Sequence, residues 1–233
     1  MGTFRGFSKE TFDFYRELSQ NNNKQWFDEH KSEYQTSVVE PAQAFTEALG
    51  QKLKGISKAI VYDTRASGSG SIIRIYRDVR FSKDKTPYKT WLGIVFWDTS
   101  GKRMKTPAYY FGMDQESARL HCGWHGFEKP VLEAYRDAVA GKSGAALVKA
   151  IEAVKSRKGF EVEEPHYKRV PAGYEAEHPR ADLLRYNSMG ASSPQISLTQ
   201  AGKANLVDLC LEYANTLKQM FLWLADINHS VST

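Results

Sequence analysis

The chain has 233 residues, of which 41% are apolar and 25% charged, and it carries a net charge of +5 at neutral pH. This composition is that of a folded globular protein, and it excludes a collagen-like or disordered chain. The mild positive charge permits nucleic acid or phosphorylated partners without requiring them. The two cysteines, Cys122 and Cys210, lie far apart and have no zinc-site spacing, so we expect free thiols in a reducing compartment.

The sequence contains no candidate for a membrane span. No stretch approaches the roughly 18 consecutive apolar residues that a spanning helix needs. The first residues, MGTFRGFSKETFDFY, lack the apolar run of a signal peptide and carry acids early. We therefore expect a cytoplasmic protein without a membrane partner, and the sequence leaves the oligomeric state open.

The first fifty residues or so predict helices. Ser8 is a typical N-cap residue, and apolar residues follow it at helical spacing. The asparagine run at 21–23 breaks this first helix, and Asn23 is placed to cap a second one. We expect helix to continue to about Leu53, with Pro41 in the first turn of a fresh helix, where proline is tolerated.

The middle of the chain predicts an antiparallel sheet. The expected strands cover residues 57–64, 72–81, 91–97, 107–113 and 117–124. Residues 91–97 are apolar and aromatic throughout, which predicts a strand buried on both faces. The connections are too short for helical crossovers, so we expect a meander in which neighbouring strands run antiparallel.

Helical periodicity returns in the last hundred residues. The expected helices cover 130–139, 143–155, a short one within 181–189, and a long one over 199–227, while 160–180 is mostly loop. Helices, then strands, then helices predict an α+β fold in which N- and C-terminal helices pack against an antiparallel sheet. No linker composition divides the chain, so we expect one domain over residues 1–233.

The densest charge lies in the stretch IIRIYRDVRFSKDKTPYKT. If 72–81 is a strand, alternation puts Asp78 between Arg74 and Arg80 on a polar face. Arg77 interrupts the other, apolar core face, which ends at Phe81. Same-face neighbours are about 7 Å apart, within reach of long side chains, so Asp78 can orient two guanidinium groups. A guanidinium held in this way directs its remaining donors at a fixed point, which suits a phosphate or carboxylate ligand.

We therefore hypothesise an anion-recognition site on this strand and the turn that follows it. The candidate binding residues are Arg74, Arg77, Asp78, Arg80, Lys85 and Tyr88, with Asp84 as the candidate catalytic general base for a reaction at a phosphorylated small molecule. No activated nucleophile or cofactor-binding motif accompanies them, so no cofactor is predicted and catalysis stays open.

Two alternatives use the same residues. In the first, the segment is a nucleic-acid-binding module in which the cations contact phosphates and Tyr76, Trp91 and Trp97 stack on bases. In the second, the arginine–aspartate pairs are a structural brace that ties sheet to loop and binds nothing.

A metal site is the other chemistry that we considered. His121, Cys122 and His125 lie close together in sequence, with Asp114 nearby, but they match no HExxH or CxxC spacing. We read the two histidines as ordinary residues of a turn and predict no metal.

The run from Arg74 to Tyr88 resembles the signature of a widespread family of uncharacterised proteins, a domain of unknown function. That signature reads Arg, two residues, Arg-Asp, one residue, Arg-Phe, three residues, Asp or Asn, Lys, two residues and Tyr, and every fixed position is filled here. NNNKQWF and HPRADLLRY at 178–186 resemble two further blocks of the family. The resemblance implies that the charged motif is the family's defining cluster. For residues 21–23 we favour a helix break, and an asparagine that reaches this cluster is the alternative. For residues 178–182 we favour a capping turn, and the alternative is that Arg180 or Asp182 joins the cluster.

Overall fold

The computed structural model describes residues 2–66, 68–99 and 102–231 of the chain. Within these residues seven strands form one antiparallel sheet that packs against N- and C-terminal helices, so the predicted α+β class is confirmed. The strands are β1 (Ile60–Val61), β2 (Leu92–Asp98), β3 (Ala108–Met113), β4 (Ser117–Trp124), β5 (Glu161–Val162), β6 (Met189–Ser192) and β7 (Ile196–Ser197).

The sheet has the order β1-β2-β3-β4-β6-β5, and β7 pairs beside the start of β4. The predicted meander is confirmed, because β2, β3 and β4 are sequential antiparallel neighbours. The strands β5, β6 and β7 were not predicted. They span only two to four residues each, too few for a period of two to show in the sequence.

The N-terminal helices are α1 (Lys9–Gln20), α2 (Lys24–Glu29), α3 (Lys31–Glu33), the π-helical turn η1 (Tyr34–Val39) and α4 (Glu40–Leu53). Asn23 caps α2 as predicted, since its Oδ1 accepts a hydrogen bond of 3.0 Å from the Trp26 N–H. The π turn comes just before Pro41, whose missing N–H and ring disturb the preceding turn of a regular α-helix.

The later helices are α5 (Lys129–Ala140), α6 (Gly144–Lys155), α7 (Ala181–Leu184), α8 (Leu198–Ala201) and α9 (Leu206–Val231). The single helix predicted over 199–227 is therefore wrong in one respect, because it is broken after α8. The Gly6 backbone packs against the break, and a Cβ there would lie 2.1 Å from the Gly202 carbonyl oxygen. None of the helices in the described residues is both long and apolar enough to cross a bilayer.

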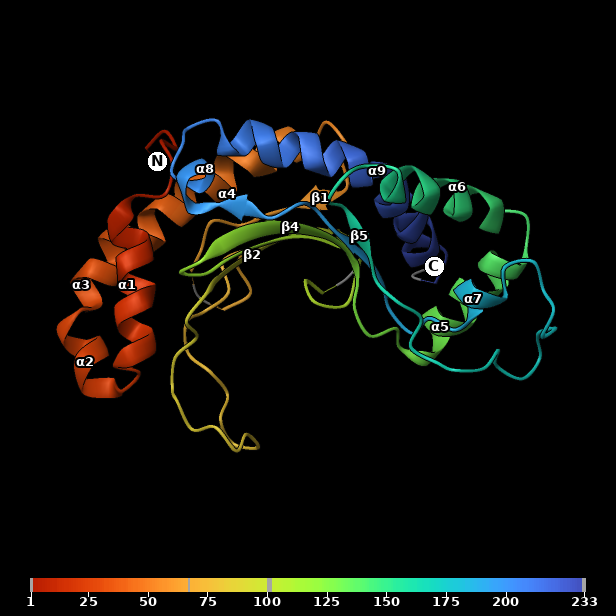
Figure 1. The fold of residues 1–233 in the computed structure, drawn as a ribbon, viewed down its shortest axis with the longest axis horizontal. Coiled ribbons are helices and arrows are strands. Elements are labelled where there is room, and N and C mark those ends of the chain that lie inside the picture. Colours follow the sequence, from red (N-terminus) through yellow and green to blue (C-terminus); the bar gives the residue numbers. More distant parts are fainter. Residues whose placement is uncertain (1, 67, 100–101, 232–233) are drawn as a thin grey trace.

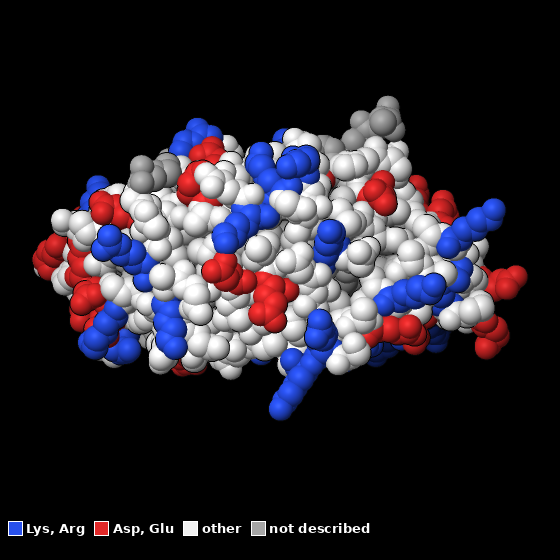
Figure 2. Space-filling model, turned by 90° about the horizontal axis from the view of Figure 1, so that it is seen from above, with Lys and Arg blue, Asp and Glu red and all other residues white. Residues whose placement is uncertain are grey.

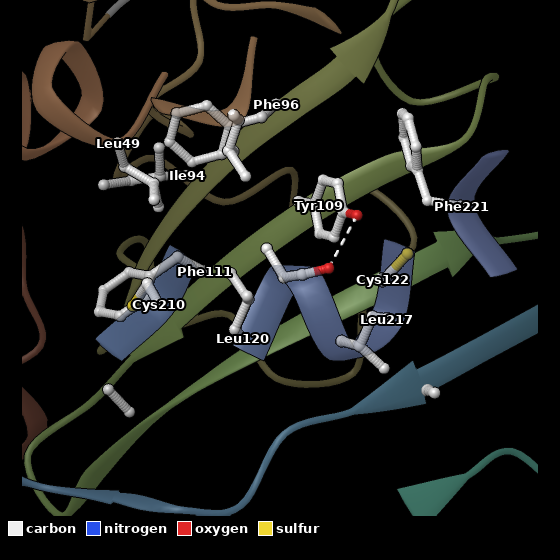
Figure 3. Close-up of a cluster of buried hydrophobic side chains, with 14 of the residues drawn as sticks. Leu49, Ile94, Phe96, Tyr109, Phe111, Leu120, Cys122, Cys210, Leu217 and Phe221 are labelled. Carbon is white, nitrogen blue, oxygen red and sulfur yellow. Dashed lines mark hydrogen bonds between the residues drawn. The ribbon is translucent and has the colours of Figure 1, made fainter. Parts of the chain in front are cut away.

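The core lies between the sheet and the helices α4, α8 and α9, which cover one face of the sheet in Figure 1. Alternation along β3 turns Tyr109 and Phe111 toward these helices, and both are fully buried. The Tyr109 hydroxyl donates a hydrogen bond of 3.1 Å to the Ala214 carbonyl of α9, and its ring stacks on Phe221 (Figure 3). Strand β2 is buried on both faces as predicted, apart from Trp97.

The other face of the sheet carries no such helical layer. Figure 1 shows the segment between β1 and β2, drawn in yellow, projecting from the sheet on the side away from α4, α8 and α9. Helices α1, α2 and α3 flank this side at one end, and α5 and α7 flank it at the other.

The prediction that residues 72–81 form a strand is wrong. Only two isolated bridges occur there, Ile72 with Ile94 and Tyr76 with Tyr88. The segment pairs with β2 as far as Ile73 and then runs past the first residue of that strand, so the sheet offers it no further partner. Phe81, expected on the core face, is 95% exposed as a result.

Candidate functional site

The charged motif forms a narrow projecting ribbon, which we call the basic finger and define as residues 74–89. Its two arms are joined by main-chain hydrogen bonds of 2.8 Å from Arg77 N to Pro87 O and from Lys89 N to Ile75 O. The finger is therefore an irregular hairpin that continues past the sheet edge. Its side chains lie mostly outside the core, and Ile75 and Tyr88 are the two buried ones.

The base of the finger is anchored to the N-terminal helices. Tyr88 is buried, and its ring stacks on Phe27 of α2 with the centroids 4.2 Å apart. The Asn22 side chain accepts a hydrogen bond from Tyr88 N and donates one to Tyr88 O, both 3.0 Å long. An asparagine of 21–23 thus reaches the motif, which was the alternative interpretation of that run, and it contacts the main chain. The buried Tyr88 ring therefore anchors the finger to α2.

One half of the finger is braced by Arg77 and Asp84. The Arg77 Nη1 lies 2.6 Å from Asp84 Oδ2 and donates to the Thr86 carbonyl at 3.0 Å. Asp84 also accepts hydrogen bonds from the Thr86 N–H and hydroxyl, each 2.9 Å long. The Thr86 N–H, then Arg77 and the Thr86 hydroxyl, lower the pKa of Asp84 to about 2. A carboxylate with so low a pKa is a weak general base near neutral pH.

The other half of the finger holds an exposed pair. Arg80 donates to both oxygens of Asp78, with Nε at 2.9 Å and Nη2 at 2.6 Å. The expected arrangement of Asp78 between two arginines is only half present. Arg74 lowers the pKa of Asp78 through its charge, after the hydrogen bonds from Arg80, but forms no ion pair in the described part of the chain.

Four cations remain once the two aspartates of the finger are paired. They are Arg74, Lys83, Lys85 and Lys89, and within the described residues none forms an ion pair with an acid. Lys85 donates to the Val79 carbonyl at 2.9 Å, and Lys89 donates to the carbonyls of Arg74 and Tyr76 at 2.8 and 2.6 Å. Burial, followed by the charges of Arg74 and Arg77, lowers the pKa of Lys89. The finger thus keeps a net positive field.

Aromatic rings are exposed beside these cations. Tyr76 is 49% exposed, Phe81 at the tip 95%, and Trp91 just past the base 37%. The Lys89 ammonium lies 5.8 Å from the centre of the Trp91 ring, and the Arg80 guanidinium lies 5.8 Å from that of Phe81. Trp97, which we had grouped with them, lies at the opposite end of β2 from the finger. Sequence reasoning placed Phe81 on the core face and so missed it as an exposed ring, although its position between Arg80 and Ser82 was an available signal.

The block at 178–186 does not join the finger, so the alternative in which Arg180 or Asp182 joins the cluster is wrong. Arg180 binds the last turn of α5, donating to the carbonyls of Val139, Ala140 and Gly141 at 2.5, 2.8 and 2.9 Å. These carbonyls have no partner within the helix, which explains why a guanidinium is held there. Asp182 pairs with Arg185 at 3.0 Å, and α7 lies beside α5 at the far end of the molecule (Figure 1).

The two histidines that prompted the metal alternative lie on and just after β4. The Nδ1 of His121 is 2.7 Å from the Ser192 hydroxyl of β6. Burial, and then the charge of Arg119, lowers the pKa of His121, which favours the neutral ring. Across the described residues, no group of three or more potential ligands gathers that could hold a metal ion.

Together these features define an α+β protein with a half-covered antiparallel sheet and a braced basic hairpin at the sheet edge. Residues 10–223 match the family described as a conserved hypothetical protein, DUF2461, and the chain belongs to that family. The resemblance to an uncharacterised family is thereby confirmed, while the role of the finger as its signature stays a prediction. A search among curated proteins found no match.

Proposed function

We propose that the protein binds single-stranded nucleic acid, with the basic finger contacting phosphates and bases. One observation carries this proposal: three exposed aromatic rings stand on the finger or at its base, beside four cations that have no acidic partner in the described residues. Proteins that hold single strands combine these two elements, because cations follow the backbone and rings stack on successive bases.

The finger suits an extended ligand better than the phosphorylated small molecule that the motif first suggested. Small-molecule sites are concave, whereas the finger projects from the sheet edge. Asp84 accepts hydrogen bonds from Arg77 and Thr86, which makes its carboxylate a weaker general base. The brace alternative fits Arg77 and Asp84 well but leaves Phe81 and the unpaired cations without a role.

Salt dependence gives the first test. Four phosphate contacts on a single strand predict that the logarithm of the association constant falls with the logarithm of salt concentration with a slope of about −3. The measurement is fluorescence anisotropy of a labelled oligothymidylate between about 50 and 200 mM salt. Arg74→Gln and Lys83→Gln should each flatten the slope by about 0.7. Lys142→Gln, which removes an exposed lysine between α5 and α6, should leave it unchanged.

The exposed ring at the tip gives the second test. Phe81→Ala should weaken oligonucleotide binding by about 1–3 kcal/mol, the value of one stacked base, without changing the salt slope. Tyr167→Ala removes a ring that is 41% exposed far from the finger and serves as the matched control. No binding of the oligonucleotide at low salt, together with Phe81-dependent binding to phosphatidylserine vesicles, would replace nucleic acid with a lipid surface. Saturable binding of a small phosphate ester to the finger would instead support the hypothesis of a site for a phosphorylated small molecule.

A further inference from the structure

The open face of the sheet carries a second, separate site. Its first feature is a row of cross-strand neighbours formed by Val95 of β2, Tyr110 of β3, His121 of β4 and Ser192 of β6, each paired with the next. All four side chains lie on the face away from α9, because their strand neighbours Phe111, Leu120 and Cys122 form the buried face. The row therefore makes a wall of side chains across the uncovered sheet.

The adjacent row has three small residues at its centre. Ala108 of β3 pairs with Gly123 of β4, which pairs with Gly190 of β6. The next position is Glu163, just after β5, whose N–H donates to the Gly190 carbonyl at 2.9 Å. With no side chains larger than a methyl group on three strands, this row forms a flat floor beside the wall.

The loop before β3 borders the space above this floor. A cavity of about 320 Å³ results, lined by the floor, by Tyr110 and His121, and by Arg103 and Met104 of the loop. A volume of this size suits a small organic ligand. The same face continues toward the finger, since Tyr110 and His121 also line a neighbouring depression that contains Trp91.

One cation, Arg103, and one carboxylate, Glu163, line this cavity and form no ion pair with each other. Arg103 is half-buried and donates one hydrogen bond to the Gly70 carbonyl, which leaves other guanidinium N–H groups available. The Glu163 carboxylate lies over the floor, where a Cβ on Gly190 would be 2.7 Å from its Oε1. Neither side chain forms an ion pair within the described residues. Arg103 comes from the loop before β3, and Glu163, whose Oε2 lies 3.5 Å from the Ser188 hydroxyl, comes from the segment just after β5. A carboxylate accepts hydrogen bonds only, so its natural ligand group is a pair of N–H donors.

We propose that this cavity binds a guanine nucleoside monophosphate, with the planar base on the glycine floor beside Tyr110 and His121. The Glu163 carboxylate accepts from the N1–H and 2-amino groups of guanine, and Arg103 binds the phosphate. The three inter-strand steps from Ala108 to Glu163 cover roughly 14 Å, enough room for an extended mononucleotide. This site is independent of the finger, so it neither requires nor excludes the binding of single strands.

The test is isothermal titration of the full chain with guanosine, inosine and adenosine monophosphates. Affinity should fall in that order, because inosine lacks the 2-amino donor and adenine lacks both donors. Glu163→Gln should weaken the binding of guanosine monophosphate about tenfold and reduce the preference of the protein for it over adenosine monophosphate. Arg103→Gln should weaken the binding of the nucleotide about tenfold and leave the binding of guanosine, which has no phosphate, unchanged. Glu164→Gln and Arg157→Gln are exposed controls expected to bind as the parent does.

Gly190→Ala is a second way to disturb the site without removing a charge. The added methyl group meets the flexible end of Glu163, so the side chain can move and the fold should be kept, as circular dichroism would verify. Weaker guanosine monophosphate binding in this variant supports the proposed pose. The proposal is overturned if guanosine monophosphate does not bind at millimolar concentration, if it binds no tighter than adenosine monophosphate, or if Arg103→Gln and Glu163→Gln leave its affinity unchanged.

Discussion

The helix-covered face of the sheet and the basic finger are held together by different kinds of interaction. On the covered face, rings and aliphatic side chains from distant segments interlock, and the residues drawn in Figure 3 are buried with few polar atoms among them. On the finger, the interactions are ion pairs and hydrogen bonds between residues close in sequence, most of them in contact with solvent. Stability should therefore reside in the first region, while the second is free to contact a partner.

Charge distribution draws the same distinction. The surface above α4, α8 and α9 mixes lysine and arginine with aspartate and glutamate, and Figure 2 shows both signs spread across that view. The finger instead carries six cations against two acids within sixteen consecutive residues, 74–89. A mixed surface favours solubility, whereas a segregated one gives a directed field that draws in anions. The finger is the part of the described surface where we expect charge to serve binding.

The largest effect should come from the covered face. Phe111→Ala removes a fully buried ring whose centroid lies 4.6 Å from that of Phe45, and it should destabilise the protein by about 3–5 kcal/mol. Phe81→Ala deletes the same atoms from a side chain that is 95% exposed and should change the free energy of unfolding by less than about 0.5 kcal/mol. Urea denaturation of both variants measures the contrast, and equal losses would show that Phe81 is buried in solution.

Much of the covered face could be predicted from the sequence. Alternation in β3 and β4, and the apolar run of β2, are local patterns that mark both the strands and their buried sides. The close approach of Gly6 to Gly202, at the break between α8 and α9, could not be predicted, because almost two hundred residues separate the two glycines. The strand β6 likewise exists through pairing with β4, and β5 through pairing with β6, which a sequence pattern does not record.

The finger was only partly predictable. Its residues were recognised as one cluster, and the Asp78–Arg80 pair follows from their spacing. The same alternation also predicted a strand, because a period of two marks any extended chain whether or not a partner strand lies beside it. The projection, the exposure of Phe81 and the burial of Tyr88 follow from where β2 begins, which is a property of the whole sheet.

The joint between the two regions gives an intermediate effect. Asn22→Ala removes both hydrogen bonds that tie the Tyr88 main chain to the start of α2, and it should cost about 1–2 kcal/mol. The Tyr88 amide should also exchange its hydrogen faster, because the base of the finger opens without global unfolding. Hydrogen exchange followed by NMR measures this. Asn21→Ala in the same turn removes only a local bond to the Glu17 carbonyl and should leave the exchange of Tyr88 unchanged.

The smallest effect concerns the brace inside the finger. Hydrogen bonds from the Thr86 N–H, Arg77 and the Thr86 hydroxyl lower the pKa of Asp84 from 3.8 to about 2. Because the folded-state pKa is the lower one, the carboxylate stabilises the fold above about pH 4, and this contribution is lost as pH falls through about 2. The effect on the free energy of unfolding should be slight, since Asp84 is exposed to solvent.

An NMR titration resolves what a melting curve would not. The Asp84 carboxyl carbon and the Thr86 amide should titrate together with a midpoint near 2, and Asp84→Asn should abolish the response of Thr86. A midpoint near 4 would mean that Asp84 holds neither Thr86 nor Arg77 in solution. Arg77 would then become a fifth unpaired cation, and the salt slope of oligonucleotide binding should steepen by about 0.7. The titration thus determines how many positive charges the finger offers to a ligand.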